Sequence, residues 1–123
     1  MMYLPLKLMA FTQEQLAQIE AMMENYITTN RPPADIRKEL DLGWRYEKTS
    51  VYLFEIRPQW DNKAIIRHED FAKATWVETK KLWNIKWLRA NGKWERYPPL
   101  ECTGNLQRFL IEVEKDPYHC FKG

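Results

Sequence analysis

The sequence contains few of the residue types that build the commoner catalytic and metal sites. It has two cysteines, Cys102 and Cys120, and two histidines, His68 and His119. These four residues lack the spacing of a zinc site, and two cysteines are too few for a disulfide scaffold. We therefore predict two reduced thiols and no bound metal. Glycine is scarce as well, with 4 residues, and the sequence has no phosphate-binding loop, no dinucleotide fingerprint and no G-x-S-x-G motif.

Long apolar runs and a strong excess of one charge are also missing. No run approaches the roughly 18 apolar residues of a membrane span, and the N-terminal stretch MMYLPLKLMAF has neither a basic n-region nor a small-residue cleavage site. The 19 basic and 17 acidic side chains give a net charge of +2, a weaker imbalance than nucleic-acid-binding proteins usually have. We therefore expect a soluble cytoplasmic protein that has no membrane partner.

Helical periodicity marks the first part of the chain and its C-terminal part. Thr12 and Gln15 have the spacing of a capping box, and an apolar stripe with a period of 3.6 residues follows them. This helix should end at residues 30–33, NRPP, and a short second helix should follow over residues 34–40. A last helix should begin after Thr103 as its cap. The apolar stripes of the two longer helices are Leu16, Ile19, Met23, Tyr26 and Ile27, and Leu106, Phe109, Leu110 and Val113.

Between these helices the apolar residues alternate with a period of 2, which is typical of half-buried strands. Pro58 should end the second strand because proline has no N–H for a ladder, residues 58–70 should form the longest irregular connection, and Pro98-Pro99 should end the sheet. The predicted strands are 42–47, 51–57, 71–79, 82–90 and 93–97. The predicted fold class is α+β, an antiparallel β-meander of about five strands packed on N-terminal and C-terminal helices, in a single domain over residues 1–123.

The stretch KLWNIKWLRANGKWERY, residues 81–97, predicts a β-hairpin rich in tryptophan. Asn91-Gly92 is a strong signal for a two-residue type I′ turn. That register would place on one face Trp83, Ile85, Trp87, Arg89, Trp94 and Arg96. A two-residue turn at Lys80-Lys81 would set Trp87 opposite the small Ala74, as a packed layer requires. We therefore expect the tryptophan face to pack against a helix, with its two arginines at the rim.

The other face of the predicted hairpin is basic and carries a tyrosine, which is typical of a surface that follows a phosphate backbone. An ordinary solvated sheet face that uses lysine for solubility is the alternative. Trp60, in the predicted long connection, is expected either to be exposed as an anchor for a base or a protein, or to fold over the end of the sheet. The candidate ligand-binding residues are Lys73, Lys86, Arg89, Lys93, Arg96, Tyr97 and Trp60. We expect a non-enzymatic binding module whose leading ligand is nucleic acid, with a protein partner or a second copy of the chain as an alternative.

A metal-dependent nuclease-like enzyme is the competing hypothesis. Asp41 precedes one predicted strand, and Glu55 and Arg57 lie on the next, an order that resembles PD-(D/E)xK nucleases. Two carboxylates hold Mg²⁺ in such sites, so Mg²⁺ is an expected cofactor only under this hypothesis. Arginine is a poor proton acceptor where the pattern has lysine, and an ion pair would explain Glu55 and Arg57 equally well. Residues 68–70, HED, are expected to be the charged entry to a strand rather than metal ligands.

Three stretches of the sequence carry a resemblance to a known family. They are ENYITTNRPPADIRKELDLGWRYEKTSVYLFEIRPQW, AKATWVETKKLWNIKWLRANGKWERYPP and the ending DPYHCFKG. Together they resemble a bacterial family of uncharacterised proteins, domain-of-unknown-function family 3024, over residues 24–123. The resemblance implies a small single-domain bacterial protein. It implies no activity, and it supplies no functional residues to carry over to this chain.

Overall fold

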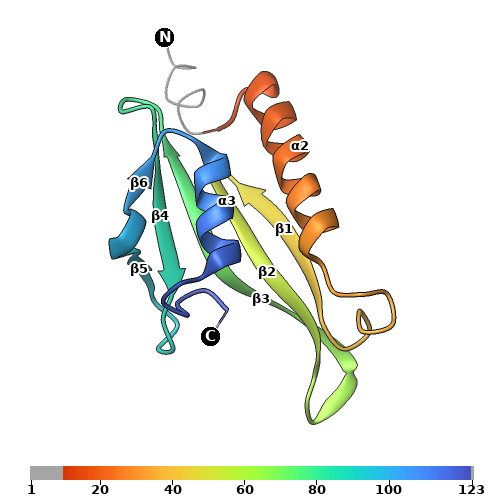
Figure 1. Ribbon diagram of the computed structural model, residues 1–123. Coiled ribbons are helices and arrows are strands. Elements are labelled where there is room, and N and C mark those ends of the chain that lie inside the picture. Colours follow the sequence, from red (N-terminus) through yellow and green to blue (C-terminus); the bar gives the residue numbers. More distant parts are fainter. Residues whose placement is uncertain (1–9, 123) are drawn as a thin grey trace.

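The computed structural model describes residues 10–122, and residues 1–9 and 123 lie outside this described part. The stretch MMYLPLKLMAF, which was expected not to be a signal peptide, therefore lies mostly outside the described residues. Figure 1 shows an antiparallel sheet with two helices in front of it, which confirms the α+β class and the meander. No helix within residues 10–122 is long and apolar enough to cross a membrane.

Helix α2, Gln13–Asn30, begins as the sequence predicts. The hydroxyl of Thr12 accepts the N–H of Gln15 at 3.1 Å, and the side-chain oxygen of Gln15 accepts the N–H of Thr12 at 2.9 Å. The predicted stripe is buried at Ile19, Met23, Tyr26 and Ile27. Arg31, in an extended conformation, ends the helix before the two prolines.

Residues 34–39 form consecutive turns, so the prediction of a second short helix over residues 34–40 is wrong. Ile36 donates its N–H to the carbonyl of Pro33 at 2.9 Å, but this bonding does not continue into a regular helix. The side chain of Ile36 is exposed. A segment this short gains too little from packing to offset the cost of helix nucleation.

The first part of the meander consists of β1 (Asp41–Glu47), β2 (Ser50–Gln59) and β3 (Asn62–Val77). Pro58 lies inside β2 opposite Ile66, so it does not end the strand as predicted. Because β1 begins opposite Ile56, no strand on that side of β2 needs the N–H that Pro58 lacks. Residues 58–70 are likewise not an irregular loop. Residues 57–67, here called the arm, are a hairpin that projects beyond the rest of the sheet (Figure 1).

Strand β4, Leu82–Leu88, follows a turn of residues 78–81 rather than the predicted two-residue turn at Lys80-Lys81. Trp87 consequently lies opposite Ala72 instead of Ala74. A shift of two residues keeps every side chain on its predicted face, since the side-chain period of a strand is 2. The expectation that Trp83 and Trp87 pack on the helix side is confirmed, and Trp76 of β3 packs there as well.

The hairpin between β4 and β5 (Trp94–Arg96) has a three-residue loop instead of the predicted two-residue turn. Arg89 donates its N–H to the carbonyl of Lys93, and Gly92 donates to the carbonyl of Arg89, both at 2.9 Å. Gly92 has a φ of 81°, as required after a type I turn. The additional loop residue shifts the register by one and moves every side chain of β5 to the other face. Trp94 and Arg96 are therefore not on the tryptophan face, and the prediction that placed them there is wrong.

The chain continues through a 3₁₀ turn, Pro98–Leu100, into β6, Cys102–Thr103, which pairs with β4. Pro98-Pro99 therefore does not end the sheet. Helix α3, Leu106–Lys115, is capped by Asn105, whose side chain accepts the N–H of Gln107 at 2.9 Å, so the prediction of Thr103 as the cap is wrong. The predicted stripe of α3 is buried, and it packs with α2 on the tryptophan face to form the core.

Candidate functional site

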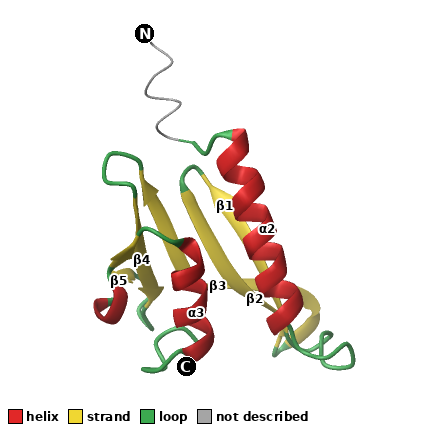
Figure 2. Cartoon of the chain, turned by 45° about the horizontal axis from the view of Figure 1, so that its top comes forward, coloured by secondary structure: helices red, strands yellow, loops and turns green. Residues whose placement is uncertain are grey.

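The face of the sheet that points away from both helices carries a row of cations. Figures 1 and 2 both show α2 and α3 on the same side of the sheet, so neither helix of residues 10–122 covers the opposite face. Strand pairing aligns one residue from each of five strands across this face. We call the set the cationic row, and its members are Arg45, Tyr52, Lys73, Lys86 and Arg96.

The cations of the row repel one another. Lys73 lies directly opposite Lys86, and Lys86 lies directly opposite Arg96. Arg45 is neutralised by Asp70 at 2.7 Å, a hydrogen bond that raises the pKa of the guanidinium, and Arg96 has only a 3.8 Å contact with Glu101. Within residues 10–122 neither lysine forms an ion pair. Like charges directly opposite each other destabilise a sheet, so an anion bound over the lysines would relieve a repulsion that the fold leaves uncompensated.

Two aromatic rings lie beside these cations. The guanidinium carbon of Arg45 is 3.8 Å from the ring centre of Tyr52, and Nζ of Lys73 is 5.2 Å from the same ring. The ring of Trp94 meets Tyr52 edge-on at 5.9 Å, and Lys73 lies 5.6 Å from its centre. Tyr52 is covered by these neighbours and is only 8% exposed. Trp94 is half-buried, which leaves part of its indole open to a planar ligand.

The structure brings together only part of the predicted binding set. Lys73, Lys86 and Arg96 belong to the cationic row, whereas Arg89 and Lys93 flank the loop at the end of the hairpin. Arg89 pairs with Glu95 at 3.3 Å and does not lie over an indole.

Tyr97 is 0% exposed, so the prediction that it belongs to the open face is wrong. Its hydroxyl donates to Oε2 of the buried Glu112 at 2.7 Å. Burial and this carboxylate raise the pKa of Tyr97.

Trp60 lies in the turn of the arm and is 89% exposed, so the alternative in which it folds over the end of the sheet is wrong. Ile65 and Ile66 of the arm are exposed as well. A groove of about 720 Å³ runs between the arm and residues 37–39, and Arg57 and Lys63 line it with Trp60. The arm is therefore a second exposed surface, separate from the cationic row.

The residues of the nuclease hypothesis do not converge. Arg31 holds Asp41 through two hydrogen bonds, of 3.2 and 2.5 Å, and Glu55 pairs with Arg57 at 2.7 Å. Leu42 is the partner of Glu55 across the ladder, so the register puts Asp41 and Glu55 on opposite faces of the sheet. The part of the chain that the structure describes contains no group of three or more His, Cys, Asp or Glu residues placed to hold a metal ion. Both cysteines are free.

Sequence reasoning missed Arg45, Tyr52 and Trp94 as members of the basic face. The alternation of β1 and β2 shows which residues share a side, but it does not show which side the helices cover. Trp94 was assigned to the wrong face because the loop before it is one residue longer than the Asn-Gly signal predicts.

These features define a class: a small α+β protein whose antiparallel sheet is covered by helices on one side and exposes a basic, aromatic face on the other. The chain belongs to the family described as Domain of unknown function (DUF3024), whose model matches residues 11–123. This match confirms the family that the sequence resemblance indicated. Neither a curated protein nor a solved structure matches the chain.

Proposed function

We propose that this protein is a non-enzymatic binding module that holds a single-stranded nucleic acid across its open sheet face. The observation that carries the proposal is the juxtaposition of Lys73, Lys86 and Arg96 on adjacent strands. Adjacent strands are about 4.8 Å apart, so these cations form a continuous line that a chain of phosphates can follow. Binding would replace repulsion between side chains by attraction to the phosphates and release counterions.

The half-buried indole of Trp94 is the reason to prefer a single strand over a duplex. Single-stranded nucleic acids are bound by a positive groove together with aromatic side chains on which bases stack, and each stack contributes about 1–3 kcal/mol. In a duplex the bases are already stacked on each other and do not reach a side chain on a sheet face. The contact of Lys73 with the Trp94 ring also keeps one cation beside the stacking surface.

Fluorescence anisotropy with a labelled single-stranded oligonucleotide, measured over a series of salt concentrations, tests the proposal. The double variant Lys73→Gln/Lys86→Gln should bind at least about tenfold more weakly, and the slope of log K against log salt should fall by about 1.4. The matched control Lys63→Gln/Lys80→Gln removes the same charge from exposed lysines outside the row and should bind like the wild type. Equal losses in the two variants would refute a site at the row.

The contribution of the bases is measured separately with an abasic strand of the same length. We expect the wild type to bind this strand about tenfold more weakly, because it retains the phosphates but offers nothing to stack on Trp94. Equal affinity for the abasic strand and the strand that carries bases would show that the site binds polyanions without using the bases. That result would contradict a specific role in nucleic-acid binding.

A protein-interaction or homodimer module is the second candidate, and the exposed Trp60 on the arm favours it. Tryptophan is enriched among the residues that dominate binding energy at protein interfaces. A chain that binds no oligonucleotide and elutes as a dimer in size-exclusion chromatography would favour this candidate over the first. No contact in the described structure favours the nuclease hypothesis.

A further inference from the structure

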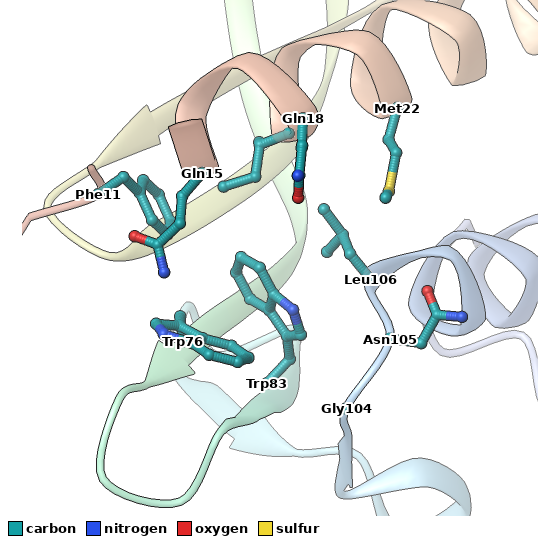
Figure 3. A pocket seen from close by; sticks show the side chains of 10 residues that line it. Phe11, Gln15, Gln18, Met22, Trp76, Trp83, Gly104, Asn105 and Leu106 are labelled. Carbon is teal, nitrogen blue, oxygen red and sulfur yellow. The ribbon is translucent and has the colours of Figure 1, made fainter. Parts of the chain in front are cut away.

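A pocket lies on the helix side of the sheet, where the first turns of α2 meet the start of α3 (Figure 3). Its volume is about 310 Å³, at the lower end of the range for small-molecule sites. The cationic row is on the opposite face, so the pocket belongs neither to that surface nor to the arm. The lining residues come from the segment before α2, from α2 itself, from β3 and β4, from the turn before α3 and from the first residue of α3.

Three aromatic rings form one wall of the pocket. Trp76 and Trp83 lie 5.3 Å apart with their planes at 56°, and Phe11 lies 5.8 Å from Trp83 at 44°. None of these rings stacks flat on another, so a planar molecule can lie against an open indole face. Met22 and Leu106 close the opposite side (Figure 3).

One hydrogen-bond donor in this wall is accessible from the pocket and has no partner in the described part of the chain. Trp76 donates its indole N–H toward Glu78 at 3.5 Å, whereas the indole N–H of Trp83 meets no acceptor within residues 10–122 and is open to the pocket. Figure 3 shows the nitrogen of Trp83 on the side that faces Leu106, toward the interior of the pocket. A ligand that supplies an acceptor would give this N–H a hydrogen bond inside a largely apolar pocket.

The polar residues of the pocket are amides, and the oxygens of two of them are already used. Oε1 of Gln15 accepts the N–H of Thr12, and Oδ1 of Asn105 accepts the N–H of Gln107, each at 2.9 Å. The NH₂ group of Asn105 remains for a ligand, whereas that of Gln15 is directed to the carboxylate of Glu78. Gln18 adds a third amide (Figure 3). No charged side chain among residues 10–122 lines the pocket, so an ionic ligand would lose its hydration without gaining a counter-ion from this part of the chain.

We infer that this pocket binds an uncharged, planar heterocycle rich in hydrogen-bond acceptors. A carbonyl oxygen or ring nitrogen of the ligand accepts the N–H of Trp83, the ring lies on the indoles, and amide groups hold the remaining acceptors. The volume accommodates one ring or two fused rings. Oxidised purines and pyrimidines have this chemistry, whereas apolar hydrocarbons lack the acceptors and carboxylic acids carry an uncompensated charge.

NMR titration of the full chain tests the inference with two probe molecules of similar shape. Caffeine is planar and uncharged and offers only acceptors, and indole is planar and uncharged but offers only a donor. The ¹H–¹⁵N resonance of the Trp83 side chain is followed in both titrations. Caffeine should shift this resonance downfield and saturably, while indole should leave it in place or shift it at least about fivefold more weakly, as expected for the loss of one hydrogen bond.

A pair of glutamine variants locates the site. Gln18→Leu should weaken caffeine binding about fivefold, because Gln18 lines the pocket, whereas Gln107→Leu, at an exposed position outside it, should bind like the wild type. A Trp83 resonance that caffeine does not move up to its solubility limit would refute the inference. Equal shifts with caffeine and indole would also refute it, because they would indicate adsorption to apolar surface without use of the N–H.

Discussion

The buried hydroxyl of Tyr97 provides a direct test of the hairpin register. Tyr97→Phe removes one oxygen atom and retains the ring, which is fully buried. The lost bond is a 2.7 Å contact with the carboxylate of Glu112, a group that Arg108 still holds at 3.1 Å from the other side. Hydrogen bonds to charged groups contribute about 1.5–3 kcal/mol. Because Arg108 remains, we expect the variant to lose about 1.5–2 kcal/mol of its free energy of unfolding.

Urea unfolding followed by tryptophan fluorescence measures this loss, provided that the slope m is the same in both proteins. Tyr118→Phe is the matched control, since Tyr118 is 65% exposed and its change should be within about 0.5 kcal/mol. A Tyr97 variant as stable as this control would refute the three-residue loop. With a two-residue loop Tyr97 would lie on the open face, and removal of its hydroxyl would cost nothing.

Two further substitutions test contacts at β1. Asp41→Asn should lower the free energy of unfolding by about 1 kcal/mol at pH 7, because hydrogen bonds from Arg31 hold the pKa of Asp41 below its ordinary value. As the pH falls, the Asp41 carboxylate is therefore protonated in the unfolded chain before it is protonated in the folded one. The difference in the free energy of unfolding between wild type and variant should consequently shrink below about pH 4. A difference that is unchanged at pH 2 in urea titrations would contradict an ion pair as its source. Gly43→Ala should cost about 1–3 kcal/mol by overpacking, since a Cβ there would lie 2.6 Å from the ring of Phe54. Gly104→Ala, whose Cβ would meet nothing closer than 3.8 Å, is its control, and equal melting temperatures for the two variants would show that the Phe54 ring moves aside freely.

Most of the fold could be predicted from the sequence because its signals are local. The capping box of α2 involves residues three apart, and the apolar stripes of both helices follow a 3.6-residue period that the tertiary structure retains. Strand alternation likewise placed Trp83, Ile85 and Trp87 on the buried face. These features need no knowledge of distant contacts.

The register of the last hairpin could not be predicted, because its second strand is compatible with either face inward. Trp94 and Tyr97 are aromatic residues of opposite parity, so each register buries one of them. The choice depends on partners that are remote in the sequence. Glu112 on α3 accepts the hydroxyl of Tyr97, and Tyr52 on β2 packs against Trp94.

Only part of the candidate site could be predicted, because its residues are brought together by contacts between strands that are remote in the sequence. Lys73 and Lys86 were assigned to the correct face because the error in the turn before β4 was an even number of residues. Arg45 and Tyr52 were missed because their place beside Lys73 depends on two further ladders. The alignment of residues across a sheet depends on the pairing register of every ladder. It therefore cannot be predicted from any single stretch of the sequence.

The order of the strands also has a kinetic consequence. From β1 to β5 each strand pairs with the next one in the chain, so each ladder closes only a short loop and loses little chain entropy. Domains dominated by such local contacts fold faster than those that pair distant strands. The five members of the cationic row are thus brought together one hairpin at a time. An insertion of one residue in the loop before β5 would turn Arg96 to the helix side, while the earlier ladders would still form. The contribution of β5 to the cationic row therefore depends on the length of this loop.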